Sequence, residues 1–243
     1  MKILIKVSYD GTNYSGWQIQ PSADTVQERL ENAIKDLTGE EVRVTGSGRT
    51  DSGVHALKQK VHFDSDANIP PEKYAEALNS LLPSDVKVIS SKKVKSDFNA
   101  RYSAKNKTYR YSLYFGKVEN PMLSRYKTLL KFPLNLDKIK SACKIIEGEH
   151  DFKCFLASGS SVKDTIRTVY SIKVVKKGNL LDFYVKGNGF LYNMVRIIVG
   201  SLIAVGENRL SLEELDNALK TGNRAGLGKT MPAKGLTLYS VTY

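Results

Sequence analysis

The stretch Gly46-Ser47-Gly48-Arg49-Thr50-Asp51-Ser52-Gly53-Val54-His55 joins two segments, 41–45 and 57–64, that alternate like β-strands. A plain hairpin connection needs only two to five residues, so this loop is longer than a turn requires. Its glycines permit backbone angles that other residues resist, and it holds a cation, a carboxylate and an imidazole. Two interpretations follow. The loop is a binding or catalytic loop on a strand scaffold, or a surface turn in which Asp51 caps its own backbone.

The segments around this loop predict the order β-α-β-β-α-β. The first helix begins with the capping-box pattern Thr25-Val26-Gln27-Glu28, and Pro70-Pro71 opens the second. In order, the predicted elements are residues 2–8, 25–39, 41–45, 57–64, 70–83 and 85–94. This order is that of a ferredoxin-like unit, an antiparallel sheet with both helices on one face.

The second half of the chain predicts the same order with one helix added. Its elements are strand 108–115, helix 136–147, strands 166–176 and 180–186, a buried apolar helix 190–205, a helix capped at Ser211 and a closing strand 236–241. A Gly- and Ser-rich loop is expected after residue 152. We therefore expect an α+β fold of two tandem ferredoxin-like (RRM-like) units forming a mixed, mainly antiparallel sheet with a central RNA-binding cleft.

A junction rich in Lys, Ser and Asn, residues 95–107, separates the two halves. It predicts two domains, 1–104 with the Asp51 loop and 105–243. The formal net charge is +12 and the pI is near 9.5, which favours a polyanionic partner, with nucleic acid first among the candidates. The lysines are spread along the chain, so the positive field is expected on a folded surface.

Membrane insertion and metal binding are not expected. No apolar run is long enough to span a bilayer, and the N-terminus does not resemble a signal peptide. The two cysteines lie far apart without a CxxC motif, which fits a reducing cytoplasm. The three histidines, His55, His62 and His150, have no metal-ligand spacing, and we interpret them as structural or RNA-contacting.

Asp51 is the first candidate for chemistry because it is the only carboxylate, and so the only strong nucleophile or base, in the loop. Arg49 and Arg196 are candidates to keep it ionised. Arg196 lies in the apolar run 190–199, where it must find a carboxylate or extend to solvent. Tyr109 could stack on a base or be an ordinary core tyrosine.

Four blocks of sequence resemble the tRNA pseudouridine synthase A family. They are Tyr9-Asp10-Gly11-Thr12-x-Tyr14-x-Gly16-Trp17-Gln18, Gly48-Arg49-Thr50-Asp51-x-Gly53-Val54-His55-Ala56, Lys107-Thr108-Tyr109-Arg110-Tyr111 and Phe190-Leu191-x-x-Met194-Val195-Arg196. They occur in the family's order, and the resemblance covers essentially the whole chain.

The resemblance implies an enzyme that isomerises uridine to pseudouridine at positions 38, 39 and 40 of the tRNA anticodon stem-loop. It implies no cofactor and no metal, and a homodimer that presents one tRNA to both subunits. Asp51 matches the catalytic aspartate and Arg196 the arginine paired with it. Tyr109 matches the residue that stacks on the target base, and Arg49 the arginine thought to fill the gap left by the flipped nucleotide.

Two other functions compete with this one. A non-catalytic RNA-binding protein of two RRM-like sheets would use RNP motifs, and no such run is present. A carboxylate-dependent glycosylase would release the base without rejoining it. The preferred uridine, the tRNAs used and the choice between attack at C1′ and proton removal at C2′ stay open.

Overall fold

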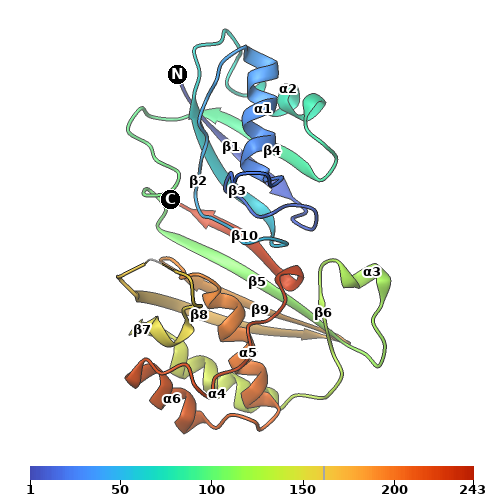
Figure 1. Ribbon diagram of the computed structural model, residues 1–243, viewed down its shortest axis with the longest axis vertical. Helices are drawn as coiled ribbons and strands as arrows, with labels where there is room; N and C mark the ends of the chain where they lie inside the picture. Colours follow the sequence, from blue (N-terminus) through green and yellow to red (C-terminus); the bar gives the residue numbers. More distant parts are fainter. Residues whose placement is uncertain (161) are drawn as a thin grey trace. The chain divides into compact units, whose positions relative to one another are not determined.

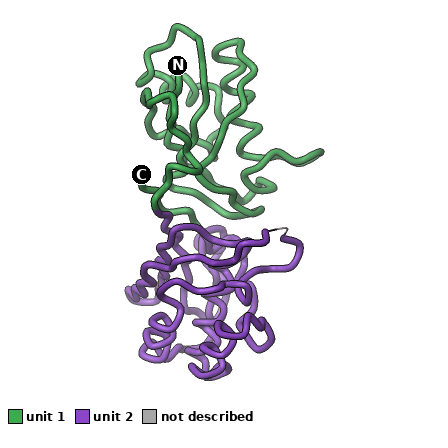
Figure 2. The backbone as a smooth tube through the Cα atoms, turned by 90° about the vertical axis from the view of Figure 1, so that its left-hand side faces the viewer, with its two compact units in different colours: residues 1–105, 237–243 green, residues 106–236 purple. Residues whose placement is uncertain are grey.

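The computed structural model describes residues 1–160 and 162–243. Ser161, in the expected Gly- and Ser-rich loop, lies outside the described residues. The chain forms two compact units, which Figure 2 shows in different colours. Unit 1 comprises residues 1–105 and 237–243, and unit 2 comprises residues 106–236. The predicted division into folding domains after residue 104 stays a prediction.

Unit 1 follows the predicted β-α-β-β-α-β order and adds one strand from the end of the chain (Figure 1). Its elements are β1 (Lys2–Tyr9), α1 (Val26–Thr38), β2 (Thr45–Gly46), β3 (His55–Asp64), α2 (Tyr74–Leu81), β4 (Val86–Lys93) and β10 (Leu236–Thr242). The Thr25 side chain caps α1 by accepting a hydrogen bond from the Glu28 N–H, and Gly39 ends the helix in a left-handed conformation. Both predicted ends of this helix are confirmed.

The sheet of unit 1 has one face covered by helices. β1 pairs antiparallel with β3 and β4, and this register puts Ile3 opposite Phe63. The Phe63 ring meets the Tyr74 ring of α2 edge to face, with centroids 5.6 Å apart. Because strand residues alternate between faces, Ile3, Ile5 and Val7 lie on this helix-covered side, where all three are fully buried.

The predicted strand 41–45 is wrong over residues 41–44, because only Thr45–Gly46 pairs with β3. The Val44 N–H donates to the Glu31 carboxylate of α1 at 3.0 Å, and the Val44 carbonyl accepts from the Gln27 side chain at 3.4 Å. The backbone groups that a strand would use are bonded to helix side chains instead.

Unit 2 also combines strands with helices. Its elements are β5 (Asn106–Phe115), α3 (Pro121–Ser124), β6 (Thr128–Leu130), α4 (Leu136–Ile146), β7 (Gly148–Asp151), the 3₁₀-helix η1 (Phe152–Phe155), β8 (Ile166–Lys177), β9 (Leu180–Gly187), α5 (Met194–Gly206), α6 (Leu212–Thr221) and the 3₁₀-helix η2 (Ala233–Gly235). Antiparallel pairing joins β5 to β9, β9 to β8 and β8 to β7, whereas β6 adds to β5 in parallel. The mixed α+β, mainly antiparallel fold class is confirmed.

The structure differs from the predicted second half in three ways: in its short elements, in the start of α5 and in the pairing of β10. The sequence did not indicate α3, β6 or β7, which are each four residues or fewer. The apolar helix begins at Met194 and not at residue 190, because Asn193 has a left-handed backbone with φ of 59°. The closing strand β10 pairs in parallel with β3 through Thr237 opposite His55 and Leu238 opposite Ala56, and it lies in unit 1.

Candidate active site

The backbone around Asp51 is fixed by the loop that follows β1. The Trp17 N–H donates to the Thr50 carbonyl at 3.0 Å, and the Gly53 N–H donates to the Tyr14 carbonyl at 3.3 Å. The Val54 N–H donates to the carbonyl of Asp51 itself at 3.1 Å. Asp51 is half-buried. The loop is therefore held on both sides of its carboxylate and is not a free surface turn.

Two glycines make this close approach possible. A Cβ on Gly16 would lie 2.6 Å from the Thr50 carbonyl oxygen, and Gly16 has a φ of 95°. A Cβ on Gly11 would lie 2.0 Å from the Val54 carbonyl oxygen. Neither position can hold a side chain without moving backbone. The Tyr9–Gln18 block thus serves to support the Asp51 loop, and its Trp17 is buried.

A buried amide supports the loop from β3. Gln59 and Ser47 are fully buried, and the Ser47 hydroxyl donates to Gln59 Oε1 at 2.6 Å. Gln59 Nε2 donates to the Gly48 carbonyl at 2.6 Å. Gln59 was not identified from the sequence. The available signal was a polar residue on a strand face that is otherwise apolar.

His55 anchors the start of β3. It is buried, and its Nδ1 lies 3.0 Å from the Gly11 backbone nitrogen. Asp10 Oδ1 lies 3.1 Å from the same Nδ1. Within the described part of the chain, no group of three or more His, Cys, Asp or Glu side chains could hold a metal ion.

Arg49 lies two residues before Asp51 in the same loop and has an exposed side chain. Among the described residues it makes no side-chain hydrogen bond or ion pair. Unit 1 thus brings Arg49 and Asp51 together on one supported loop.

In unit 2, Tyr109 lies on β5 and Arg196 on α5, and these two elements are in contact. Tyr109 is 7% exposed, and its ring meets that of Phe190 edge to face, with centroids 5.3 Å apart. Every residue of α5 except Arg196 is buried. Arg196 is half-buried, donating from Nε to the Met231 carbonyl at 2.6 Å and from its terminal nitrogen to Asn193 Oδ1 at 2.5 Å. These contacts hold the guanidinium in place, so it does not simply extend into solvent.

Tyr111 lies near Arg196 and was not identified as a site residue from the sequence. It lies two positions after Tyr109 on the same face of β5, and its hydroxyl donates to the Pro232 carbonyl at 2.7 Å. Burial raises the pKa of Tyr111 well above its usual range, while Thr128 and the nearby Arg196 cation lower it. The segment Met231-Pro232 thus fixes both Arg196 and Tyr111 through carbonyl oxygens, which a side-chain pattern does not reveal.

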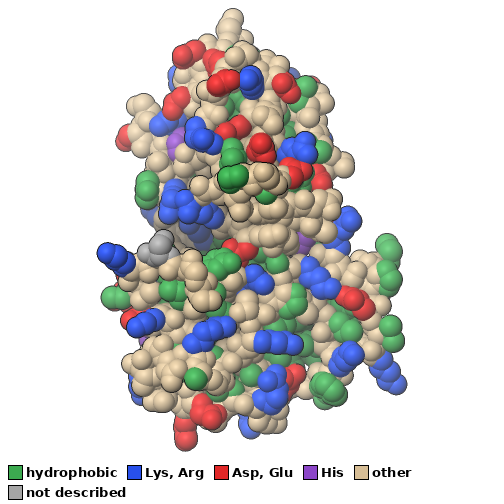
Figure 3. Space-filling model, in the orientation of Figure 1, with side chains coloured by type: hydrophobic (Ala, Val, Ile, Leu, Met, Phe, Trp, Pro, Cys, Tyr) green, Lys and Arg blue, Asp and Glu red, His purple; other side chains and the backbone are tan. Residues whose placement is uncertain are grey.

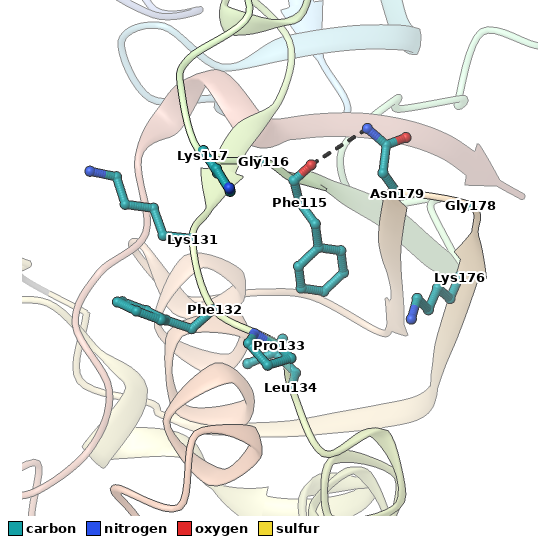
Figure 4. A pocket seen from close by; sticks show the side chains of 10 residues that line it. All are labelled: Phe115, Gly116, Lys117, Lys131, Phe132, Pro133, Leu134, Lys176, Gly178 and Asn179. Carbon is teal, nitrogen blue, oxygen red and sulfur yellow. Dashed lines mark hydrogen bonds between the residues drawn. The ribbon is translucent and has the colours of Figure 1, made fainter.

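A pocket of unit 2 lies at the Phe115 end of β5, away from Tyr109 (Figure 4). Its lining includes Phe115, Phe132 and the lysines Lys117, Lys131 and Lys176. None of the predicted site residues lines it.

Comparison with known proteins identifies the class. A family model described as tRNA pseudouridine synthase matches residues 5–103 and 142–243. The chain is 47% identical over 241 residues to tRNA pseudouridine synthase A of Thermoanaerobacter sp. (strain X514), covering 99% of each chain. It is 45% identical over 243 residues to the protein of the same name from Ruminiclostridium cellulolyticum, covering 100% of this chain and 99% of that relative.

Among solved structures, a chain of the "archaeal box H/ACA sRNP Nop10-Cbf5 complex" matches with a TM-score of 0.38 and 14% identity. The match covers 96% of this chain and 59% of that one.

The family model and the relatives define an isomerase that acts on uridine in tRNA. The chain belongs to the tRNA pseudouridine synthase family, and the resemblance carried by the four sequence blocks is confirmed. No helix in residues 1–160 or 162–243 is long and apolar enough to cross a membrane.

Proposed function

We propose that this enzyme converts uridine to pseudouridine at positions 38, 39 and 40 of the tRNA anticodon stem-loop, with Asp51 as the catalytic carboxylate. The observation that carries this proposal is the support of the Asp51 loop. Its backbone is hydrogen-bonded on both sides of Asp51 by Trp17 and Tyr14. A carboxylate held in this way meets the need of catalysis for a preorganised group.

The reaction breaks the N1–C1′ bond, turns the uracil and joins C5 to C1′. In one route Asp51 attacks C1′, the uracil leaves as an anion, and C5 then attacks C1′ and expels the carboxylate. In the other route Asp51 removes a proton from C2′ and the uracil leaves C1′ as an anion, which gives a C1′–C2′ double bond. C5 then adds to C1′, and Asp51 returns the proton to C2′. In both routes C5 loses its hydrogen, N1 gains one, and Asp51 is regenerated. The nucleotide must leave the stacked helix first, because C1′ and C5 cannot be attacked within it.

Three further residues have roles in this proposal. Arg196 pairs with Asp51 and keeps it ionised, since a nearby cation favours a charged carboxylate. Its fixed guanidinium suits that role. Tyr109 stacks on the target base, and its contact with Phe190 would hold the ring in position. Arg49, which is exposed beside Asp51, fills the gap left by the flipped nucleotide.

The proposal includes a homodimer that works in the cytoplasm and presents one tRNA to both subunits. The family resemblance is the support for the dimer. Cys143 and Cys154 are buried free thiols, which suits a reducing compartment.

The test is tritium release from tRNA transcripts labelled at uridine C5. Asp51→Asn keeps the shape of the side chain and should lower the release rate by at least about a hundredfold while RNA binding persists. The control is Asp137→Asn on the exposed start of α4, which should release tritium at the wild-type rate. Replacing uridines 38, 39 and 40 one at a time by cytidine would identify the reacting positions.

Two results would contradict the proposal. Wild-type release by Asp51→Asn would remove Asp51 from the chemistry, and release from a transcript that lacks all three uridines would move the target elsewhere. Free uracil in the product would indicate a glycosylase.

A further inference from the structure

The helix-free face of the unit 1 sheet carries four lysines, Lys6, Lys58, Lys60 and Lys92, which we call the lysine face. Lys6 of β1 lies directly opposite Lys60 of β3. Lys92 of β4 lies opposite Leu4, the next residue of β1 on this face. Lys58 precedes Lys60 by two residues and so points to the same side of β3. This is the side opposite Ile3 and Phe63, which face the helices.

The four lysines of this face repel one another. Burial and repulsion by Lys6, Lys92 and Lys58 lower the pKa of Lys60. Like charges directly opposite on neighbouring strands destabilise a sheet, as Lys6 and Lys60 must do here. Across the described ranges, none of the four lysines forms an ion pair with a carboxylate. Asp64, at the end of this face, is paired with Lys2 at 4.0 Å.

Two lysines on the helices of unit 1 and just before them are paired with carboxylates. Lys35 of α1 pairs with Glu41 at 2.7 Å, and Lys73 before α2 pairs with Glu76 at 3.0 Å. On the side of unit 1 that Figure 3 shows, where α1 and α2 lie in front of the sheet, Lys and Arg side chains are mixed with Asp and Glu. The lysine face thus differs from the helix-covered side of unit 1, where side chains of both charges are mixed.

Aromatic side chains border this face. The Lys58 ammonium lies 5.7 Å from the centre of the Tyr239 ring. On the side of Lys92, the rings of Phe98 and Tyr243 are 4.9 Å apart, and both line a pocket that Lys92 shares. Asp97 is a carboxylate of that pocket. Cations that follow a backbone beside rings that can stack on bases are the recurring parts of surfaces that bind nucleic acid strands.

We propose that the lysine face binds the phosphodiester backbone of the tRNA substrate, at a stretch of RNA different from the one that reaches Asp51. This inference rests on the proposed function for the identity of the RNA. Asp51 precedes β3, whereas Lys60 lies five residues beyond His55, roughly 16 Å further along an extended strand. That distance is several times the roughly 3.4 Å between successive phosphates along one strand of a duplex, so the phosphates on the lysine face belong to nucleotides other than the one at Asp51.

The test compares two variants that each remove four positive charges. The first, K6Q/K58Q/K60Q/K92Q, neutralises the lysine face. The second, K35Q/K73Q/K140Q/K144Q, removes lysines that are exposed at α1, α2 and α4 and are paired with carboxylates. Affinity for full-length tRNA is measured over a range of salt concentrations, and turnover is measured by tritium release on full-length tRNA and on an isolated anticodon stem-loop.

The lysine-face variant should raise KM for full-length tRNA about tenfold or more while kcat is kept. Each lysine that contacts a phosphate should lower the slope of log K against log salt by about 1. KM for the isolated stem-loop should rise by a smaller factor, because the stem-loop offers fewer phosphates to the lysine face. The second variant, K35Q/K73Q/K140Q/K144Q, should keep the wild-type slope of log K against log salt.

Three outcomes would overturn the inference. Both variants could lose the same affinity for tRNA, or the lysine-face variant could keep the wild-type salt slope. The lysine-face variant could also lose as much affinity for polyglutamate, a polyanion without phosphates or bases, as for tRNA. Relief of repulsion should leave the variant at least as stable as wild type in thermal unfolding. If the quadruple variant does not fold, K60Q alone should lower the slope by about 1. A wild-type enzyme that binds tRNA through the lysine face yet releases no tritium would refute the proposed function and keep this inference.

Discussion

Gly16 shows how a residue without a side chain can govern a catalytic loop. We expect Gly16→Ala to push the Thr50–Asp51 backbone away, because the added Cβ would lie 2.6 Å from the Thr50 carbonyl oxygen. The strained φ of 95° adds to this effect. The free energy of unfolding should fall by about 1–3 kcal/mol, as measured by urea denaturation. The rate of tritium release should fall by about tenfold or more, since misplacement by about 1 Å is costly in catalysis.

Gly39→Ala is the matched control for this substitution. Gly39 has a φ of 75°, but a Cβ there would meet no atom within 4 Å. It should therefore lose stability through backbone strain and keep its rate of tritium release. A Gly16→Ala enzyme that is as active as Gly39→Ala would show that Asp51 tolerates movement of its support.

His62 gives the protein a dependence of stability on pH. Burial and the nearby Lys2 lower the pKa of His62 in the folded state, although Asp64 opposes this, and its Nδ1 accepts the Ala100 N–H at 3.1 Å. The unfolded chain then binds a proton more readily than the folded one. Stability is therefore fully present above the ordinary histidine pKa and is lost as pH falls through the lowered folded value.

We expect the free energy of unfolding to decrease from pH 7.5 to pH 5.5 in the wild type, and to decrease less in His62→Gln. Urea denaturation at the two pH values measures both. His150→Gln, at a half-buried histidine elsewhere, should keep the wild-type dependence. Equal slopes for wild type and His62→Gln would place the pH dependence in other groups.

At the scale of elements, the Gly-rich segment 222–230 packs backbone to backbone against α5. A Cβ on Gly200 would lie 1.9 Å from the Lys229 carbonyl oxygen, and one on Gly228 would lie 2.1 Å from Gly200. The Ser201 hydroxyl accepts the Gly228 N–H at 3.1 Å. Gly228 thus serves the packing of this segment on α5, and the segment leads directly to Met231, which holds Arg196.

Gly200→Ala should therefore damage both stability and activity. Overpacking costs about 1–3 kcal/mol in unfolding free energy, and displacement of Met231 should loosen Arg196 and slow tritium release. Gly226→Ala, in the same segment, has a φ of 86° but no atom within 4 Å of its Cβ, so its effect should be limited to backbone strain. Normal activity in Gly200→Ala would show that the position of Arg196 does not depend on how segment 222–230 packs against α5.

The same elements show what a sequence pattern can predict. The start of α6 was predicted because its capping box is local, and both reciprocal hydrogen bonds of Ser211 and Glu214 form. The strand predicted at residues 41–44 does not form there, because Glu31 of α1 accepts the Val44 N–H that a strand would use. Asp51 was found through the charge and glycines of its loop. Gln59 was not found, because it acts from a buried strand face. Met231 was not found, because it acts through its backbone carbonyl.

At the scale of the whole molecule, β10 returns the end of the chain to unit 1. Thr237, Leu238 and Val241 are buried, and Leu238 lies opposite Ala56 at the start of β3. The Lys105 N–H donates to the Thr242 carbonyl at 2.9 Å, and the Tyr243 hydroxyl donates to the Ala100 carbonyl at 2.9 Å. No local pattern could predict a partner so distant in sequence, because the pairing is selected only once both strands are folded.

Deletion of residues 237–243 should therefore destabilise unit 1 and the loop that carries Asp51. Burial of a Leu, Val or Phe side chain contributes about 1.5–3 kcal/mol each, so the loss should be several kcal/mol. Hydrogen exchange followed by mass spectrometry should show faster exchange at the start of β3 and in the Asp51 loop, with loss of tritium release. Tyr243→Phe, which removes only the hydroxyl bond to Ala100, should keep near-normal protection. Unchanged protection of His55 and Ala56 in the truncated chain would show that unit 1 is complete without β10, as the predicted 1–104 domain requires.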